Sequence, residues 1–290
     1  MDPKSDHSRR DGESMKFKLP CADLIRTTPT KQWLEVSRYL DKKDFNVLIG
    51  KLKTSVYKHV VFKFGEVAVI QKEYDLSYLA NKHGVPNFIK FICAFTCNDS
   101  IDAIRERNFE VNAYICKGPG DQLGVAIMPY YQLGSVDNYT WNEGNFVLLK
   151  ATLKQIVFAA LYAYDQFQFI HRDFHLGNVL LRETKKKTVA YGPVTAETKG
   201  LFPMIMDFGR STRAENAYTL VYRDIKRMIS LTFDMPQSDI VLHCDLDPLN
   251  TLAKDNEPIS SITYAFMADL IDNITIRYVK SKLPKVTFLM

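Results

Sequence analysis

Two short segments of the sequence carry side chains that could perform phosphoryl transfer. The first, residues 169–181, reads FIHRDFHLGNVLL and places Asp173 and Asn178 on a loop between apolar runs. An Asp on such a loop can accept a proton from an attacking hydroxyl, and an Asn can hold a magnesium ion. The second segment, MIMDFGRS, places Asp207 after three apolar residues and before Gly209, which is typical of a metal-binding carboxylate at the end of a buried strand. We therefore predict a phosphate-transferring site with Asp173 as the base and Asn178 and Asp207 as metal ligands.

The composition is that of an ordinary soluble globular chain, long enough at 290 residues for one large domain or two lobes. A net charge of +5 is compatible with an anionic nucleotide, but no basic block indicates nucleic-acid binding. We find no N-terminal apolar leader and expect no apolar run long enough to span a bilayer, so no membrane partner is predicted.

The cysteines are odd in number and scattered along the chain. They are Cys21, Cys93, Cys97, Cys116 and Cys244. Cys93 and Cys97 have no second pair that would complete a zinc site, so we expect all five to be reduced thiols. Reduced thiols predict an intracellular protein, cytoplasmic or nuclear.

The first 131 residues divide into three segments of different composition. Residues 1–15 are polar and charged, which predicts a disordered tail. Residues 16–44 contain apolar side chains near helical spacing, in KQWLEVSRYL, and predict a helical extension. Residues 45–131 contain FNVLIG, SVYKHVVFKFG and VAVIQK, whose β-branched and aromatic residues predict the antiparallel strands of a small lobe.

Residues 132–290 are expected to form a larger, mainly helical lobe. FVLLKATLKQIVFAALYAYDQ carries one apolar stripe at helical spacing and predicts a long central helix that leads to His171. YRDIKRMI begins another helix, and two or three more follow. The expected fold class is therefore α+β, with a small antiparallel-sheet lobe and a larger helical lobe.

The two chemistry-bearing segments, in this order, resemble the catalytic loop and the Asp-Phe-Gly segment of eukaryotic-type protein kinases. The chain is most similar to the atypical haspin-like group, because His175 stands where most protein kinases have Lys and because no Ala-Pro-Glu precedes YRDIKRMI. The resemblance covers roughly residues 45–290 and is strongest at 169–181 and 204–210; the compact chain also resembles kinases of large DNA viruses. The resemblance to protein kinases implies a bilobal, monomeric serine/threonine protein kinase that uses ATP and Mg²⁺ to phosphorylate a protein substrate.

The resemblance also assigns roles in the first lobe. Lys63, at the end of VVFK, is expected to position the nucleotide phosphates, and Glu73 to hold that lysine. Lys72 is the rival lysine, but Glu73 would then be too near in sequence to be its partner. Gly50 opens a connection, residues 50–57, that lies where a glycine-rich phosphate loop would be, although only one of the usual three glycines is present.

Further roles follow from the resemblance near the centre of the chain. Met128 would guard the back of an adenine pocket, and Tyr131 would offer a backbone donor because Pro129 has no amide. Asp224 would brace the backbone of the catalytic loop. His175 would either hydrogen-bond the loop backbone or help to neutralise the transferred phosphoryl group, and the sequence does not choose between these roles.

Two other functions remain open at the level of sequence. The pattern His-x-Asp-x-His-x-Gly-Asn, satisfied at 171–178, is shared with small-molecule kinases of the aminoglycoside or choline type. The incomplete glycine loop is compatible with a pseudokinase that binds nucleotide without turnover. Transfer to a small alcohol, or binding without transfer, would distinguish these from a protein kinase.

Overall fold

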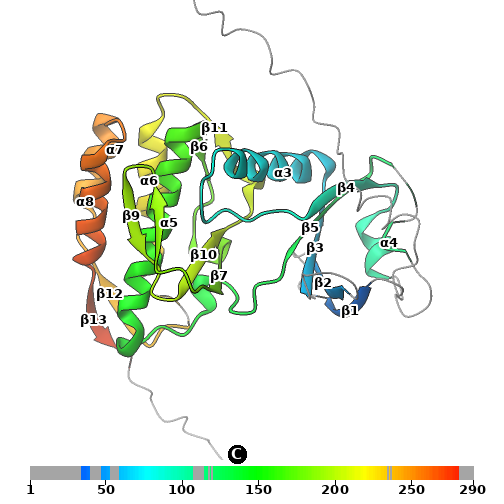
Figure 1. The fold of residues 1–290 in the computed structure, drawn as a ribbon, viewed down its shortest axis with the longest axis horizontal. Coiled ribbons are helices and arrows are strands. Elements are labelled where there is room, and N and C mark those ends of the chain that lie inside the picture. Colours follow the sequence, from blue (N-terminus) through cyan, green and yellow to red (C-terminus); the bar gives the residue numbers. More distant parts are fainter. Residues whose placement is uncertain are drawn as a thin grey trace, which may run out of the picture. The chain divides into compact units, whose positions relative to one another are not determined.

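The computed structural model describes residues 34–39, 47–52, 59–106, 114–116, 118, 120–233, 235 and 237–280 (Figure 1). The chain forms two compact units, one of Met1–Ala68 with Ile92–Ile127 and the other of Val69–Phe91 with Met128–Met290. Helices and small antiparallel sheets are both present, which confirms the α+β class. The predicted tail at 1–15 lies outside the described residues.

The first unit is built on a five-stranded sheet in the order β1-β2-β3-β5-β4. Its strands are β1 (Leu34–Tyr39), β2 (Val47–Leu52), β3 (His59–Gly65), β4 (Cys93–Cys97) and β5 (Leu123–Pro129), the last two residues of β5 belonging to the second unit. Along β3, Val60, Phe62 and Phe64 are buried while Val61 and Lys63 are half-buried, the alternation expected of a strand with one face on a core. A short helix, α4 (Ile101–Arg105), is capped by the Ser100 hydroxyl, which accepts a hydrogen bond from Ala103 N.

Two predicted elements are wrong, one in the 16–44 extension and one in the small lobe. Residues 34–39 form strand β1 rather than a helix, and β1 pairs antiparallel with β2. Leu34 and Val36 are two residues apart, which is also the period of a strand, and the backbone hydrogen bonds to β2 decide between the two periods. VAVIQK is not a strand, because it begins helix α3 (Val67–Lys82), whose buried residues Ile70, Glu73, Ser77 and Ala80 follow helical spacing.

The second unit is organised around α5 (Phe146–Phe167), the predicted central helix. Helix α5 packs against α6 (Tyr218–Leu231), α8 (Ser261–Asp272) and the strands of the following hairpins. The segment Glu143–Phe167 is long and apolar enough to cross a membrane, contrary to our expectation, but 61% of its most apolar window is buried inside the protein. Burial on this scale is that of the core helix of a globular unit.

Two nested antiparallel pairs follow α5. Strand β7 (Val179–Glu183) pairs with β10 (Leu201–Ile205), with Val179 opposite Ile205. Between them lies the hairpin of β8 (Thr188–Tyr191) and β9 (Val194–Glu197), and the Lys185–Lys187 run lies between β7 and β8. Helix α7 (Asp247–Asp255) and the pair formed by β12 (Ile240–His243) and β13 (Thr275–Val279) complete the described part of the unit.

A buried asparagine joins the chain after α3 to the β7–β10 pair. Asn87 has a left-handed backbone, with φ 65°, and is 2% exposed. Its Nδ2 donates to Pro203 O at 2.8 Å, and its Oδ1 accepts from the hydroxyl of Tyr191 at 2.5 Å. Its carbonyl accepts from Ile205 N at 2.6 Å. These bonds fix α3, β8 and β10 to one another within the second unit.

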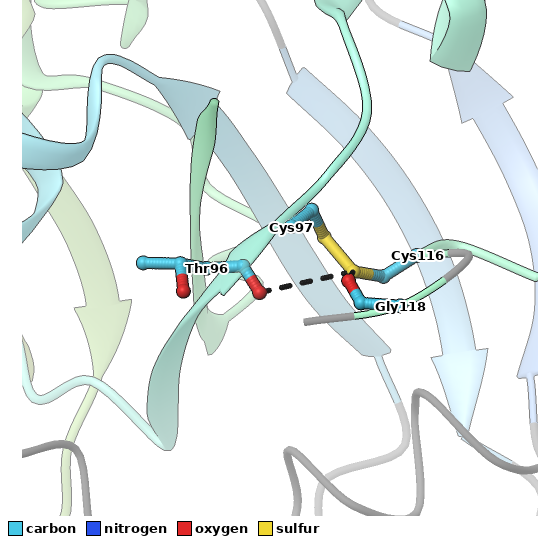
Figure 2. The surroundings of a disulfide bond; sticks show 4 residues. All are labelled: Thr96, Cys97, Cys116 and Gly118. Carbon is cyan, nitrogen blue, oxygen red and sulfur yellow. Dashed lines mark hydrogen bonds between the residues drawn. A yellow bond between two sulfur atoms is a disulfide. The ribbon is translucent and has the colours of Figure 1, made fainter. Parts of the chain in front are cut away.

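Cys97 and Cys116 form a disulfide in the first unit (Figure 2). Cys93 is also disulfide-bonded, so the expectation of reduced thiols is wrong for these three cysteines. Cys97 ends β4 and Cys116 follows α4, and both are fully buried in the core of the unit. Their Cα atoms are 5.6 Å apart, and the carbonyl oxygens of Thr96 and Gly118 lie beside the sulfur of Cys116. Two cysteines 19 residues apart are brought together by the fold, which sequence spacing alone did not indicate. Cys244 is a free thiol.

Candidate active site

The loop that carries Asp173 is closed by hydrogen bonds made by one asparagine. The loop leaves β6 (Phe169–Ile170), passes through a single 3₁₀ turn (Leu176–Asn178) and enters β7. Asn178 is buried, its backbone N–H donates to His175 O, and its Nδ2 donates to Asp173 O, both at 3.0 Å. Because Nδ2 is used inside the loop, Oδ1 is the amide atom that could bind a cation.

Asp207 and Asn178 lie at the same end of the β7–β10 pair. Asn178 directly precedes β7, Met206 directly follows β10, and Met206 N donates to Asn178 O at 2.9 Å. Asp207 follows with a left-handed backbone, at φ 64°, and its side chain is exposed. The two predicted metal ligands are therefore carried by adjacent backbone segments.

The buried ring of His171 connects the loop to the segment that follows β10. Its ring is 3% exposed, and its Nε2 lies 3.0 Å from Met206 O. The ring stacks on Phe174 and meets Phe169 and Phe208 edge-on. Burial lowers the pKa of His171 to about 4, although the carbonyl of Met206 and the charge of Asp207 oppose that shift. The imidazole is therefore neutral near pH 7 and donates from Nε2.

Asp224 braces the loop as predicted by the resemblance. From α6, its Oδ2 accepts a hydrogen bond of 2.7 Å from Arg172 N. Arg172 has a left-handed backbone, with φ 67°, which is rare for a residue with a Cβ. Burial raises the pKa of Asp224, while the backbone N–H groups of Arg172 and His171 oppose the shift. The carboxylate thus holds an unfavourable backbone conformation directly before Asp173.

Two arginines that sequence reasoning did not assign lie beside Asp173. Arg210 Nη1 is 3.7 Å from Asp173 Oδ2, and Arg227 Nη2 is 3.7 Å from Asp173 Oδ1. Arg210 directly follows Asp-Phe-Gly, and Arg227 lies three residues after Asp224, but neither spacing shows that both side chains converge on one carboxylate. Asp173 itself is 23% exposed and accessible to an acceptor.

His175 lies beside the glycine of the loop. A Cβ on Gly177 would come within 2.9 Å of His175 Nδ1 and 3.0 Å of Asp137 Oδ2. Gly177 therefore allows the imidazole and the Asp137 carboxylate to approach the loop backbone closely. This placement suits a role for His175 in shaping the loop, and its role toward a phosphoryl group stays a prediction.

Glu73 lies next to the Asp-Phe-Gly segment. It is 1% exposed on α3, and a Cβ on Gly209 would come within 3.2 Å of its Oε1. Its neighbour Lys72 donates from Nζ to Gly209 O at 3.0 Å. Because Lys72 lies on a helix and not on a strand, the structure does not give it the place expected of a phosphate-positioning strand lysine. Lys63 lies on strand β3.

The remaining predicted residues have these positions. Gly50 lies inside β2, paired with Val36 and Val60, and residues 53–58 lie outside the described residues. Lys63 and Gly50 belong to the first unit, whereas Met128 and Tyr131 belong to the second. Met128 is buried at the end of β5, and Tyr131 O accepts from Gly134 N at 3.2 Å. Their roles toward a nucleotide stay predictions.

The predicted metal ligands have the right chemistry for Mg²⁺. A carboxylate and an amide oxygen are hard donors, and Mg²⁺ in phosphate-transfer sites uses one or two protein ligands together with phosphate oxygens and water. No group of three or more His, Cys, Asp or Glu side chains suited to a metal occurs within the described ranges. The donor set therefore fits a magnesium ion delivered with a nucleotide.

Comparisons with known proteins give two partial matches. A segment of 95 residues is 34% identical to "Uncharacterized protein 038R" of Invertebrate iridescent virus 3, and covers 28% of this chain and 17% of that protein. A segment of 75 residues is 28% identical to "Uncharacterized protein ZK177.2" of Caenorhabditis elegans, and covers 24% of this chain and 25% of that protein. The chain thus matches a quarter or less of each relative. No family model matches the chain.

Proposed function

We propose that the chain is an ATP-dependent serine/threonine protein kinase with a bilobal, haspin-like fold. The observation that carries this proposal is the convergence of Asp173, Asn178 and Asp207 at one end of the β7–β10 pair. Asn178 contacts both of the other segments, through Asp173 O and through Met206 N. A proton acceptor and two oxygen ligands held on adjacent backbone are the parts that phosphoryl transfer needs from a protein.

In the proposed reaction, the hydroxyl oxygen of the acceptor forms a bond to the γ-phosphorus of ATP. The bond from that phosphorus to the bridging oxygen breaks, ADP leaves with the electron pair, and the hydroxyl proton passes to the Asp173 carboxylate. Asn178 and Asp207 would hold Mg²⁺, which when bound neutralises phosphate charge and orients the nucleotide. Lys63, Glu73, Gly50, Met128 and Tyr131 are proposed to contact or position ATP on the basis of the resemblance.

Two features of the second unit support the assignment of Asp173 as the base. The Asp224–Arg172 bond fixes the backbone directly before Asp173, and the His171–Met206 bond fixes the backbone directly before Asp207. The carboxylate of Asp173 remains partly exposed, as a group must be to reach a protein hydroxyl.

A monomeric, intracellular protein remains part of the proposal, although the Cys97–Cys116 disulfide removes one argument for a reducing compartment.

The test is transfer of radiolabelled γ-phosphate from ATP with Mg²⁺. Wild type should label a mixture of basic and acidic proteins, and Asp173→Ala should lose more than about 100-fold of that rate while it unfolds at the same urea concentration. Asn178→Ala should raise the Mg²⁺ concentration needed for half-maximal transfer, because it removes a proposed ligand. Full activity of Asp173→Ala would refute the assignment. Label on small alcohols alone would indicate a small-molecule kinase, and nucleotide binding without label would indicate a pseudokinase.

A further inference from the structure

Two positive charges from different elements meet at the proposed catalytic base. Arg210 ends the 3₁₀ turn Phe208–Arg210, and Arg227 lies on α6. Each guanidinium group is 3.7 Å from a different oxygen of Asp173. The proposed transfer needs Asp173 to accept a proton from a hydroxyl, and this step gives neither arginine a role.

The geometry of these pairs leaves the arginines available to another anion. A separation of 3.7 Å is too long for a hydrogen bond, and the side chains of Arg210 and Arg227 are 76% and 55% exposed. Exposed pairs of this kind stabilise a fold very little. One carboxylate also cannot neutralise two guanidinium groups, so net positive charge remains at the surface where an acceptor must arrive.

Other charges nearby do not remove this excess. Two acids other than Asp173 belong to this region: Asp207 is assigned to the metal and would be neutralised by it, and the Asp224 carboxylate, which attracts Arg172 and Arg227, offsets one positive charge. Arg172 also has an exposed side chain and adds positive charge to the loop. A guanidinium group presents a planar set of donors that matches carboxylate and phosphate groups, and this makes arginine well suited to recognise either one.

We propose that Arg210 and Arg227 bind an anionic group beside the acceptor hydroxyl, so that the substrate is a serine or threonine flanked by acidic or phosphorylated residues. This inference rests on the proposed function and names the substrate class of the same site. When the substrate anion pairs with the two guanidinium groups, they leave the Asp173 oxygens, which are then free to take the hydroxyl proton. Arg210 and Arg227 are therefore specificity-determining residues.

The test uses four synthetic peptides that differ only in the residues next to a single serine. These are aspartate, alanine or arginine on both sides, or phosphoserine on one side. Transfer is measured as kcat/KM, and binding of the same peptides, fluorescently labelled, is measured by anisotropy without ATP. The enzymes are wild type, Arg210→Ala, Arg227→Ala and Arg227→Glu. Arg223→Ala is the matched control, because it removes the same charge from α6 at a residue that has no ion pair with Asp173 among the described contacts.

Wild type should prefer the aspartate peptide over the alanine peptide by about 25-fold, and each alanine variant should lose about fivefold of binding to the aspartate peptide. The loss should fall on KM rather than kcat and should be smaller with the alanine peptide. Arg227→Glu should move the preference toward the arginine peptide, and Arg223→Ala should behave like wild type. A stronger effect with the phosphoserine peptide than with the aspartate peptide would identify phosphate as the preferred anion.

Three results would overturn the inference. In the first, wild type binds all peptides equally or binds none. In the second, the Arg210 and Arg227 variants lose kcat equally on every peptide. In the third, Arg223→Ala loses as much binding to the aspartate peptide as Arg210→Ala and Arg227→Ala do. The second of these would assign the arginines to the transferred phosphoryl group. Because binding is measured without ATP, a chain that binds acidic peptides through these arginines but transfers no phosphate would refute the proposed function and leave this inference standing.

Discussion

Acidification should destabilise the second unit through His171. Burial lowers the pKa of His171 from 6.5 to about 4, and the ring is 3% exposed. The unfolded chain therefore takes up a proton at His171 before the folded chain does as the pH falls. The neutral, buried imidazole contributes stability that is fully present above about pH 6.5 and is lost as the pH falls through about 4.

The magnitude follows from the two pKa values. The full change corresponds to about 3 kcal/mol of unfolding free energy, and about 2 kcal/mol of it is already lost near pH 5. Other groups also titrate in this range, so the contribution must be isolated with a variant. His171→Phe keeps a ring that can stack on Phe174, lacks a titratable nitrogen, and loses the bond to Met206 O. That lost bond lowers stability by about 1–2 kcal/mol at every pH.

The assay is urea unfolding of wild type and His171→Phe by circular dichroism at several pH values between about 5 and 7.5. The advantage of wild type in unfolding free energy, about 1–2 kcal/mol at the highest pH, should fall by about 2 kcal/mol, so that at the lowest pH the two proteins are equal or His171→Phe is the more stable. Hydrogen exchange of the α5 amides assigns the change to the unit that contains His171. Parallel pH profiles for the two proteins would show that His171 is not held neutral by burial and would refute the reasoning.

Two further predictions concern contacts that hold each unit together. Asn87→Ala removes the side-chain bonds to Pro203 and Tyr191 and should lower the unfolding free energy of the second unit by about 3 kcal/mol in urea unfolding. Asn87→Gly removes the same bonds but relieves the left-handed backbone, so its loss should be smaller by about 1 kcal/mol. Equal losses in the two variants would contradict this account. Cys97→Ser removes a disulfide that closes a loop of 19 residues and should lower the unfolding free energy of the first unit by about 3 kcal/mol, measured by thermal unfolding with and without reductant. Peptide maps of wild type that lack a linkage between residues 97 and 116 would contradict this prediction.

The parts of the fold that the sequence predicted are those specified by local pattern. The apolar stripe over residues 146–166 coincides with α5, because a buried helix needs apolar residues at every turn of that face. The candidate metal ligands were found because each follows or precedes an apolar strand, and strands β7 and β10 then bring them to one end. The α+β class followed from the change between strand-like and helical segments along the chain.

The parts that the sequence did not predict depend on contacts between distant segments. The run VAVIQK has strand-like composition, but on α3 its Val69 lies beside Gly209, which is more than a hundred residues away along the chain. Likewise, Arg210 and Arg227 are recognisable only once the 3₁₀ turn Phe208–Arg210 and helix α6 are placed around Asp173. Left-handed backbone at Asn87 was also not foreseen, since its cost is offset by hydrogen bonds to β8 and β10.

The backbone around the candidate base is held in an unfavourable conformation by side chains that take no part in the proposed chemistry. Arg172 and Asp207 both have left-handed backbone, at φ 67° and 64°, which costs about 1 kcal/mol or more for a residue with a Cβ. Asp224 accepts from the first of these residues, and His171 bonds the carbonyl that precedes the second. Strain of this kind persists only where neighbouring contacts maintain it, and here it lies on both sides of the site. Left-handed backbone also occurs outside the site, at Gln168 and Lys199, so the feature that bears on the proposed role of Asp173 is the pair of contacts made by Asp224 and His171, which keep the loop in one conformation.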